Sequence, residues 1–428
     1  MRAQRLTTII FIGMLLGIAV GYACNQLWPD PQTAKTIAGY ISLFTDIFLR
    51  LIKMIIAPLV FTTLVVGVAH MGDTKAVGRI GGKAMLWFVS ASLVSLLLGL
   101  IMVNILRPGD NLNLPLPEAS VATNVKVSSL TLREFVVHMV PRSIIEAMAN
   151  NEILQIVVFS LFVGVAVTAL GDKGKQLVAL ADEIAHVMLK ITNYVMLMAP
   201  LAVFAAVADV VTTQGLGILV TYGKFMGGFY LSLAILWVLL IAAGYVFFSP
   251  RVLQLMREIR EPFLLAFSTA SSEAAYPKTV EQLERFGVSN RIVSFVLPLG
   301  YSFNLDGTMM YTTFASIFIA QAYGIELSLG TQIVMLLVLM VTSKGMAGIP
   351  RASLVVIAAT LSTFNIPEAG LLLILGIDHF LDMGRSATNV IGNSIATCVV
   401  AKWEGEYDPK GMHEPLEDPE PVHPPIAA

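Results

Sequence analysis

The sequence predicts an all-α polytopic membrane protein with eight transmembrane helices and two re-entrant helical hairpins. Of its 428 residues, 56% are hydrophobic and only 13% are charged, whereas soluble proteins usually carry about 25% charged residues. Eight apolar stretches are long enough to cross a bilayer, and two further segments are apolar but broken at their centres by small polar residues, Gly and Pro. Lipid is the natural solvent for a chain of this composition.

The apolar stretches follow one another along most of the chain. The first is interpreted as a spanning helix rather than a signal peptide, because no small-residue cleavage site with a soluble remainder follows it. Two of the stretches exceed the roughly 20 residues that a bilayer requires, so we expect them to tilt, bend or protrude. The eight stretches lie near 7–28, 37–70 (long), 84–106, 151–169, 178–211 (long), 218–248, 290–323 and 366–402.

The distribution of Lys and Arg predicts how the chain is oriented in the membrane. Short loops rich in these residues face the cytoplasm, and here they alternate with poorer loops in a way that places both termini in the cytoplasm. The last segment, 404–428, is polar, acidic and rich in Pro, a composition that predicts a disordered cytoplasmic tail.

Two segments, 263–285 and 328–362, are predicted to be re-entrant hairpins. Their centres read Ser-Thr-Ala-Ser-Ser-Glu at 268–273 and Thr-Ser-Lys-Gly-Met-Ala-Gly-Ile-Pro-Arg at 342–351. Non-helical backbone is tolerated at membrane depth only where protein or a cavity encloses it. Paired broken segments point to a binding site near the midplane. The alternative is two pairs of ordinary helices joined by tight loops at the membrane surface.

The last predicted span carries a polar stripe on one helical face. Charged side chains at bilayer depth cost about 2.5–3.5 kcal/mol each on insertion scales, so a stripe of this size indicates a functional site. The alternative is an Asp382–Arg385 ion pair that only holds helices together. The stripe residues, spaced by three or four, are Asp378, Asp382, Arg385, Ser386, Asn389 and Asn393.

A second polar group interrupts the span at 290–323. Asn304, Asp306 and Thr308 surround Gly307, and this pattern predicts a local unwinding of the helix. Freed carbonyls together with a carboxylate form a hard oxygen site that suits a small cation. The alternative is a Gly kink, with Asp306 paired to a neighbouring helix.

Together these motifs resemble the dicarboxylate/amino acid:cation symporters, and the resemblance covers about 7–404. It implies a homotrimer in the inner (plasma) membrane. It also implies a scaffold of 1–70 and 130–212, and a transport domain of 84–106 and 218–403 that slides like an elevator and is gated by the second hairpin. The motifs are Asn304-Leu-Asp-Gly-Thr308, the Ser-rich first hairpin, Ala347-Gly-Ile-Pro350, and Asp382-Met-Gly-Arg385 followed by Asn389.

The resemblance also implies a role for each residue that matches a family motif. Arg385 would bind the side-chain carboxylate of the substrate, for which a guanidinium fork is well shaped, and Asp382 would bind its α-ammonium. Asn389 and Ser386 would bind the main carboxylate. The pocket would be completed by Ser271, Ser272, Thr308, Gly348 and Ile349.

The Asp382–Arg385 combination predicts an acidic amino acid, aspartate or glutamate, as the substrate. C4-dicarboxylate members of the family lack an Asp at this position, because succinate has no ammonium to neutralise. A C4-dicarboxylate is the alternative, and it stays open because Arg351 stands where a Gly is common in the second hairpin. In either case the expected partners are a small anionic substrate and the bilayer.

The coupling ion is predicted to be a proton, with no cofactor. Sodium-coupled members have an Asp where this chain has Asn393, and they have Tyr and Thr on the third span where this chain has Phe88 and Ala91. The loss of one carboxylate and two oxygen ligands weakens two sodium sites, and the first hairpin is similar to that of proton–glutamate carriers. Glu273 and Asp306 are the candidate proton carriers, with a hydrogen-bonding role at the hairpin tip as the alternative for Glu273. A Na⁺ site is the alternative, built from Asn304, Asp306, Asn389, Asn393, Ser302, Leu305, Ser343, Lys344 and Met346.

Other classes of function lack support in the sequence. There is no nucleophile–base pair, metal motif or phosphate loop, which argues against an enzyme. The net charge of −2 and the absence of a basic stripe argue against nucleic-acid binding. An anion channel is closer to this family than an enzyme is, because family members can leak anions. A channel alone would not require the Asp382–Arg385 pair.

Overall fold

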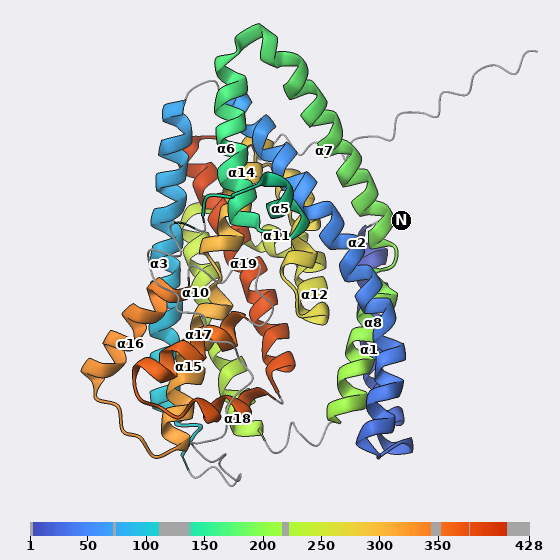
Figure 1. Ribbon diagram of the computed structural model, residues 1–428, viewed down its shortest axis with the longest axis vertical. Coiled ribbons are helices and arrows are strands. Elements are labelled where there is room, and N and C mark those ends of the chain that lie inside the picture. Colours follow the sequence, from blue (N-terminus) through green and yellow to red (C-terminus); the bar gives the residue numbers. More distant parts are fainter. Residues whose placement is uncertain are drawn as a thin grey trace, which may run out of the picture.

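The computed structural model describes residues 3–71, 74–110, 137, 139–215, 222–343, 352–375 and 377–408. Within these residues the chain is built of helices and contains no strand; a single isolated bridge joins Val288 to Tyr407. The predicted all-α membrane fold is therefore confirmed (Figure 1). Residues 409–428, most of the predicted tail, fall outside this description.

Four described helices are long and apolar enough to cross a membrane, and a bent pair makes a fifth span. The pair bends by 55° at its break, as expected for the overlong stretch at 178–211. The four are α1 (Ala3–Leu27), α2 (Pro31–Met71), α3 (Thr74–Leu106) and α10 (Gly223–Phe248), and the pair is α7 (Lys175–Met196) with α8 (Ala199–Gln214).

The other predicted spans are shorter, broken or polar. The fourth is α6 (Ile153–Ala169), and the seventh is divided into α14 (Asn290–Phe303) and α15 (Asp306–Ala322). The eighth, α19 (Asp378–Glu404), is 27 residues long but carries the polar stripe. Short helices connect these elements: α5 (Ile144–Ala149), η1 (Gly171–Gly174), α11 (Arg251–Glu258), η4 (Glu368–Gly370) and α18 (Leu371–Leu375).

Both predicted hairpins correspond to pairs of short helices. The first consists of α12 (Arg260–Thr269), η2 (Glu273–Ala275) and α13 (Tyr276–Arg285), and the chain reverses at Ala270, whose φ is +50°. The second consists of α16 (Leu329–Thr342) and α17 (Ala352–Thr363). Its tip lies outside the described residues, and with it Lys344, Met346, Gly348, Ile349 and Arg351.

The predicted unwinding of the seventh span exists, but its position was predicted wrongly. The helix breaks at Asn304 and Leu305, and Gly307 already lies inside α15. Gly307 instead permits a close approach to α19, since a Cβ there would come within 2.6 Å of the Arg385 carbonyl oxygen. The break thus brings the start of α15 directly against the polar stripe.

Helix α1 packs closely on α8 because glycines recur on one of its faces. A Cβ at Gly13, Gly17 or Gly21 would come within 2.6–2.8 Å of a carbonyl oxygen of α8. Such spacing of small residues lets transmembrane backbones approach each other. In Figure 1, α1, α2, α7 and α8 gather on the right, and α3, α10, α15, α16, α17 and α19 lie to the left.

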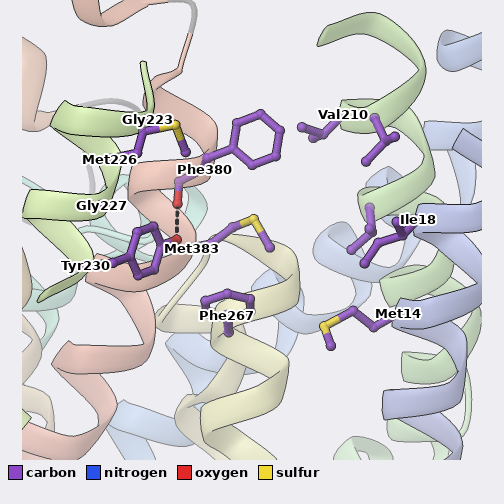
Figure 2. A pocket seen from close by; sticks show the side chains of 12 residues that line it. Met14, Ile18, Val210, Gly223, Met226, Gly227, Tyr230, Phe267, Phe380 and Met383 are labelled. Carbon is purple, nitrogen blue, oxygen red and sulfur yellow. Dashed lines mark hydrogen bonds between the residues drawn. The ribbon is translucent and has the colours of Figure 1, made fainter. Parts of the chain in front are cut away.

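An apolar cavity of about 440 Å³ lies between these two groups of helices. Figure 2 shows Met14 and Ile18 of α1 facing Phe380 and Met383 of α19 across it, with Phe267 of the first hairpin at its edge. On the α10 side the lining includes Gly223, Met226, Gly227 and Tyr230.

Candidate functional site

The centre of the site is the guanidinium of Arg385, whose residue is only 1% exposed. Its Nη1 donates to Ser353 Oγ at 2.7 Å, and its Nη2 donates to Asp378 Oδ1 at 3.1 Å and lies 3.0 Å from Asp382 Oδ1. The guanidinium also stacks over the Tyr311 ring, 4.1 Å from its centroid. Residues of three helices, α15, α17 and α19, thus fix one buried cation.

The charges around Arg385 do not cancel. With both carboxylates ionised, Asp378 and Asp382 outweigh the single guanidinium, so the cluster is more than a mutually neutralising ion pair. Buried charge needs a compensating partner. Asp382 has a side chain that is 35% exposed, whereas that of Asp378 is 5% exposed. Asp382 is therefore the more accessible of the two carboxylates to a cationic group from outside the protein.

Asn389, one turn beyond Arg385, ties α19 to the beginning of α15. Its Oδ1 accepts from the backbone N–H of Gly307 at 3.0 Å, and its Nδ2 donates to Thr308 Oγ1 at 3.2 Å. Ser386 beside it is 5% exposed. The predicted residues Arg385, Ser386, Asn389 and Thr308 are thus brought together on one side of α19.

A second, oxygen-rich group lies one further turn along α19. Asp306 is fully buried; its Oδ1 accepts from Ser95 Oγ and its Oδ2 from Asn304 Nδ2, both at 3.2 Å. Asn304 Nδ2 also donates to Asn393 Oδ1 at 3.1 Å. The buried Asn304 Oδ1 and Ser302 Oγ have no hydrogen-bond partner among the described residues, so they remain available to a proton donor or a small cation.

Two further predicted cation ligands, Leu305 and Ser343, lie within the described residues. Leu305 lies at the helix break and is partly exposed. Ser343, directly after α16, is buried, and its hydroxyl donates to the Met340 carbonyl at 3.3 Å.

Gly392 provides the space in which the Asp306 carboxylate sits. A Cβ at this position would overlap Asp306 Oδ2. We expect Gly392→Ala to displace the carboxylate from Asn304, to raise the KM for the coupling ion, and to cost about 1–3 kcal/mol in stability through overpacking. Thermal unfolding and ion-dependent uptake measure both effects.

Gly78→Ala on α3 is the matched control, because a Cβ there meets open space. It should be neutral or slightly stabilising, since Ala is the better helix former. Equal behaviour of the two variants would contradict the assigned role of Gly392.

Both hairpins approach α19. In the first, Ala266 and Ala275 pack on Val390, the neighbour of Asn389. Ser271 Oγ accepts from the Ala274 N–H at 3.2 Å at the tip, where Ser272 and Glu273 are partly exposed. Glu273 lies within electrostatic range of Lys53 on α2 and of Glu152. The second hairpin reaches α19 through Ser353 of α17.

Three residues that contact Arg385 were given no binding role from the sequence. Asp378 was on the predicted polar face, and its spacing of seven residues from Arg385 was the signal that could have identified it. Tyr311, whose hydroxyl donates to Asp378 Oδ1 at 3.2 Å, and Ser353 lie on other helices. Nothing in the local sequence marks either of them.

Comparison with known proteins finds that this chain is similar in sequence to transporters. The family model described as the sodium:dicarboxylate symporter family matches residues 6–403. A proton/sodium-glutamate symport protein of Geobacillus stearothermophilus is 41% identical over 413 residues, which cover 95% of this chain and 96% of that protein. A C4-dicarboxylate transport protein of Laribacter hongkongensis is 39% identical over 427 residues, covering 99% and 96%.

A further C4-dicarboxylate transport protein, from Rhodospirillum rubrum, is 42% identical over 407 residues, covering 94% of this chain and 89% of that protein. Similarity to carriers of the two substrate types is therefore about equal. The degree of identity does not distinguish glutamate from C4-dicarboxylates.

Proposed function

Because the chain belongs to the sodium:dicarboxylate symporter family, we propose that it imports L-aspartate or L-glutamate together with protons. The family consists of membrane symporters of small anionic substrates, so the protein is a transporter and not an enzyme.

The observation that supports this substrate is the cluster of one guanidinium and two carboxylates on α19. An acidic amino acid offers a distal carboxylate for Arg385 and an ammonium for Asp382, the more exposed of the two carboxylates. Charge-assisted hydrogen bonds of this kind are the strong ones. A C4-dicarboxylate would satisfy Arg385 but would meet Asp382 with a second negative charge.

A C4-dicarboxylate is nevertheless the second candidate substrate. It is favoured by the relatives named C4-dicarboxylate transport proteins, which are 39% and 42% identical to this chain over nearly its whole length. The two candidates differ by one ammonium group, so competition between aspartate and succinate separates them directly.

Protons are the proposed coupling ion, with Asp306 and Glu273 as their carriers. The amide of Asn393 supplies no charge to the group around Asp306, and a Na⁺ ion usually needs several oxygens with compensating charge. Na⁺ is the alternative, because the glutamate-carrying relatives are named proton/sodium symport proteins and because the Asn304 and Ser302 oxygens are available.

The proposed movement is an elevator in a homotrimer of the plasma membrane, with both termini in the cytoplasm. The helices α1, α2, α7 and α8 would belong to the fixed scaffold. Helices α3, α10, α14, α15 and α19 and both hairpins would slide past them as one body carrying the substrate. The cavity between α1, α8, α10 and α19 lies on this sliding surface and is lined by apolar side chains.

A bulky side chain in this cavity is expected to stop the movement without affecting binding. Gly227 lines the cavity, and a Cβ there meets nothing within 4 Å. The indole of Gly227→Trp can therefore occupy the cavity and obstruct the sliding of one group of helices past the other. We expect the maximal uptake rate to fall about tenfold or more while the substrate Kd, measured calorimetrically, is unchanged.

Gly82→Trp on α3, another open position, serves as the control and should transport normally. A normal uptake rate for Gly227→Trp would contradict sliding along this surface.

Uptake into proteoliposomes tests the proposed function. L-aspartate or L-glutamate should accumulate under an imposed pH gradient, acidic outside, in the absence of Na⁺. Strict dependence on Na⁺ would overturn proton coupling. Competition by succinate but not by aspartate would overturn the substrate and favour the C4-dicarboxylate.

A further inference from the structure

We propose that Glu404, at the C-terminal end of α19, is a positioning residue that keeps α3 seated against the coupling-ion group while the carrier slides. The inference rests on the proposed function and extends it to a residue far from the substrate pocket. Glu404 lies about three helical turns beyond Asn393, so it would act through another element. That element is α3, whose Ser95 donates to the buried Asp306 carboxylate at 3.2 Å.

One face at the beginning of α3 is fastened to the end of α19. The Glu404 side chain is only 2% exposed; it accepts from Arg79 Nη2 at 2.8 Å, and Lys83 Nζ lies 2.6 Å from its Oε1. Lys83 also donates to the Trp403 carbonyl at 2.9 Å, and Trp87 packs edge-on against the Trp403 ring. The three α3 residues are spaced by four and therefore share a helix face. Charge-assisted hydrogen bonds of this kind are strong.

The chain directly after α19 is fastened in turn to other helices of the proposed sliding body. The Ser289 N–H donates to the Glu406 carbonyl at 3.1 Å, and Arg291 Nη2 of α14 lies 2.7 Å from the Glu406 carboxylate. The ring of Tyr407 packs edge-on against Phe248 of α10, with their centroids 5.1 Å apart. The end of α19 is therefore a fixed point to which α3 can be tied.

The beginning of α3 needs such a fastening because a short link joins it to the proposed scaffold. Helix α2 ends at Met71 and α3 begins at Thr74. Three Cα–Cα steps of 3.8 Å span at most about 11 Å, so a larger displacement between the two groups of helices draws on the start of α3. Arg79 and Lys83 lie within the first three turns of α3. The pull therefore acts where the ion pairs hold.

Loosening this end of α3 would affect the ion group and leave the substrate cluster in place. The far end of α3 is fastened separately, since Asn104 Nδ2 donates to Gln332 Oε1 of α16 at 2.6 Å. Ser95 lies between the two fastenings and contacts Asp306. The partners of Arg385 described above belong to α15, α17 and α19. A shift of α3 therefore weakens the binding of the coupling ion more than that of the substrate.

Removing the charge of Glu404 tests this role. We expect Glu404→Gln to raise the coupling-ion concentration for half-maximal uptake about tenfold, because charge-assisted hydrogen bonds are lost. The substrate Kd, measured calorimetrically at saturating coupling ion, should change less than about twofold. Hydrogen bonds from Arg79 hold the pKa of Glu404 below its usual range, so a pH series near neutrality titrates the coupling site and leaves this carboxylate ionised.

A longer link between α2 and α3 separates a pull on α3 from a general loss of stability. Inserting Gly-Gly-Ser between positions 72 and 73 of Glu404→Gln adds about 10 Å of reach and should restore the response to the coupling ion. Glu258→Gln is the matched control, because Glu258 of α11 pairs with Arg285 of α13 at 3.8 Å; it should behave as wild type. An unchanged ion response in Glu404→Gln would overturn the positioning role, and so would a defect that the insertion does not restore.

A second variant keeps the test decisive if Glu404→Gln does not fold. Arg79→Gln removes one of the two cations at a side chain that is 55% exposed, and it should show a smaller shift in the same direction, restored by the same insertion. Failure of the proposed function would look different. If wild-type uptake requires Na⁺ instead of a pH gradient, proton coupling is wrong, and the same variants are titrated with Na⁺. The positioning role is then judged by the same shift, because Asp306 belongs to both candidate ion groups.

Discussion

Replacing Arg385 by alanine is expected to lower the uptake of acidic substrates by a factor of at least about 100 while the protein remains folded. The guanidinium is buried, and it is the cation to which the substrate carboxylate would bind. Removing one partner of a buried charge pair costs about 3–5 kcal/mol, which would correspond to about 10²- to 4 × 10³-fold if it appeared in the affinity. Uptake of labelled aspartate and thermal unfolding of the purified protein measure the two parts of this prediction.

The same substitution leaves Asp378 and Asp382 without their cation, so a second variant separates binding from folding. In Arg385→Ala combined with Asp378→Asn, one surplus negative charge is removed, and stability should recover in part while uptake does not. Arg257→Ala on α11, an exposed position, is the control for loss of an arginine. Uptake at the wild-type level in either Arg385 variant would refute the role given to the guanidinium.

Replacing Asp382 by asparagine is expected to reverse the preference between aspartate and succinate. The amide keeps the shape of the side chain but cannot pair with an ammonium by charge, so the affinity for aspartate should fall about 10-fold to 100-fold. Succinate gains, because a negative charge is removed from its site. Inhibition of labelled uptake by each unlabelled compound gives the ratio of the two affinities.

A matched control for Asp382 is Asp172→Asn, since the Asp172 side chain is 93% exposed. It should leave the ratio unchanged. A parallel loss of both affinities in Asp382→Asn would mean that Asp382 serves only to hold Arg385, through the 3.0 Å contact between them, and that the ammonium binds elsewhere.

The sequence predicts those features that are determined by residues close together in the chain. The polar stripe of α19 was visible because helical spacing places Asp382, Arg385 and Asn389 on one face. The first hairpin was visible because small polar residues interrupt an apolar segment, and it corresponds to α12 and α13. The break in the seventh span was predicted as well, although two or three residues too late.

The position of the break in the seventh span depends on contacts that the local sequence does not contain. The polar residues around Gly307 place the predicted unwinding there, but the lack of a Cβ at Gly307 serves the close approach of α19. The choice between these two roles depends on a helix almost eighty residues away. Tyr311 and Ser353 were missed for the same reason, because only the folded chain brings them to Arg385.

The glycine face that joins α1 to α8 also has a consequence for biosynthesis. Asn25, at the end of α1, donates to the carbonyl of Thr212, 187 residues later in the chain. At about 5–20 residues per second, a ribosome needs roughly 10–40 s between delivering one partner and the other. During that interval the first helix would have inserted alone, with its glycines toward lipid or toward whatever insertion factor shields them. Early synthesis is therefore the period in which α1 is most open to mispairing.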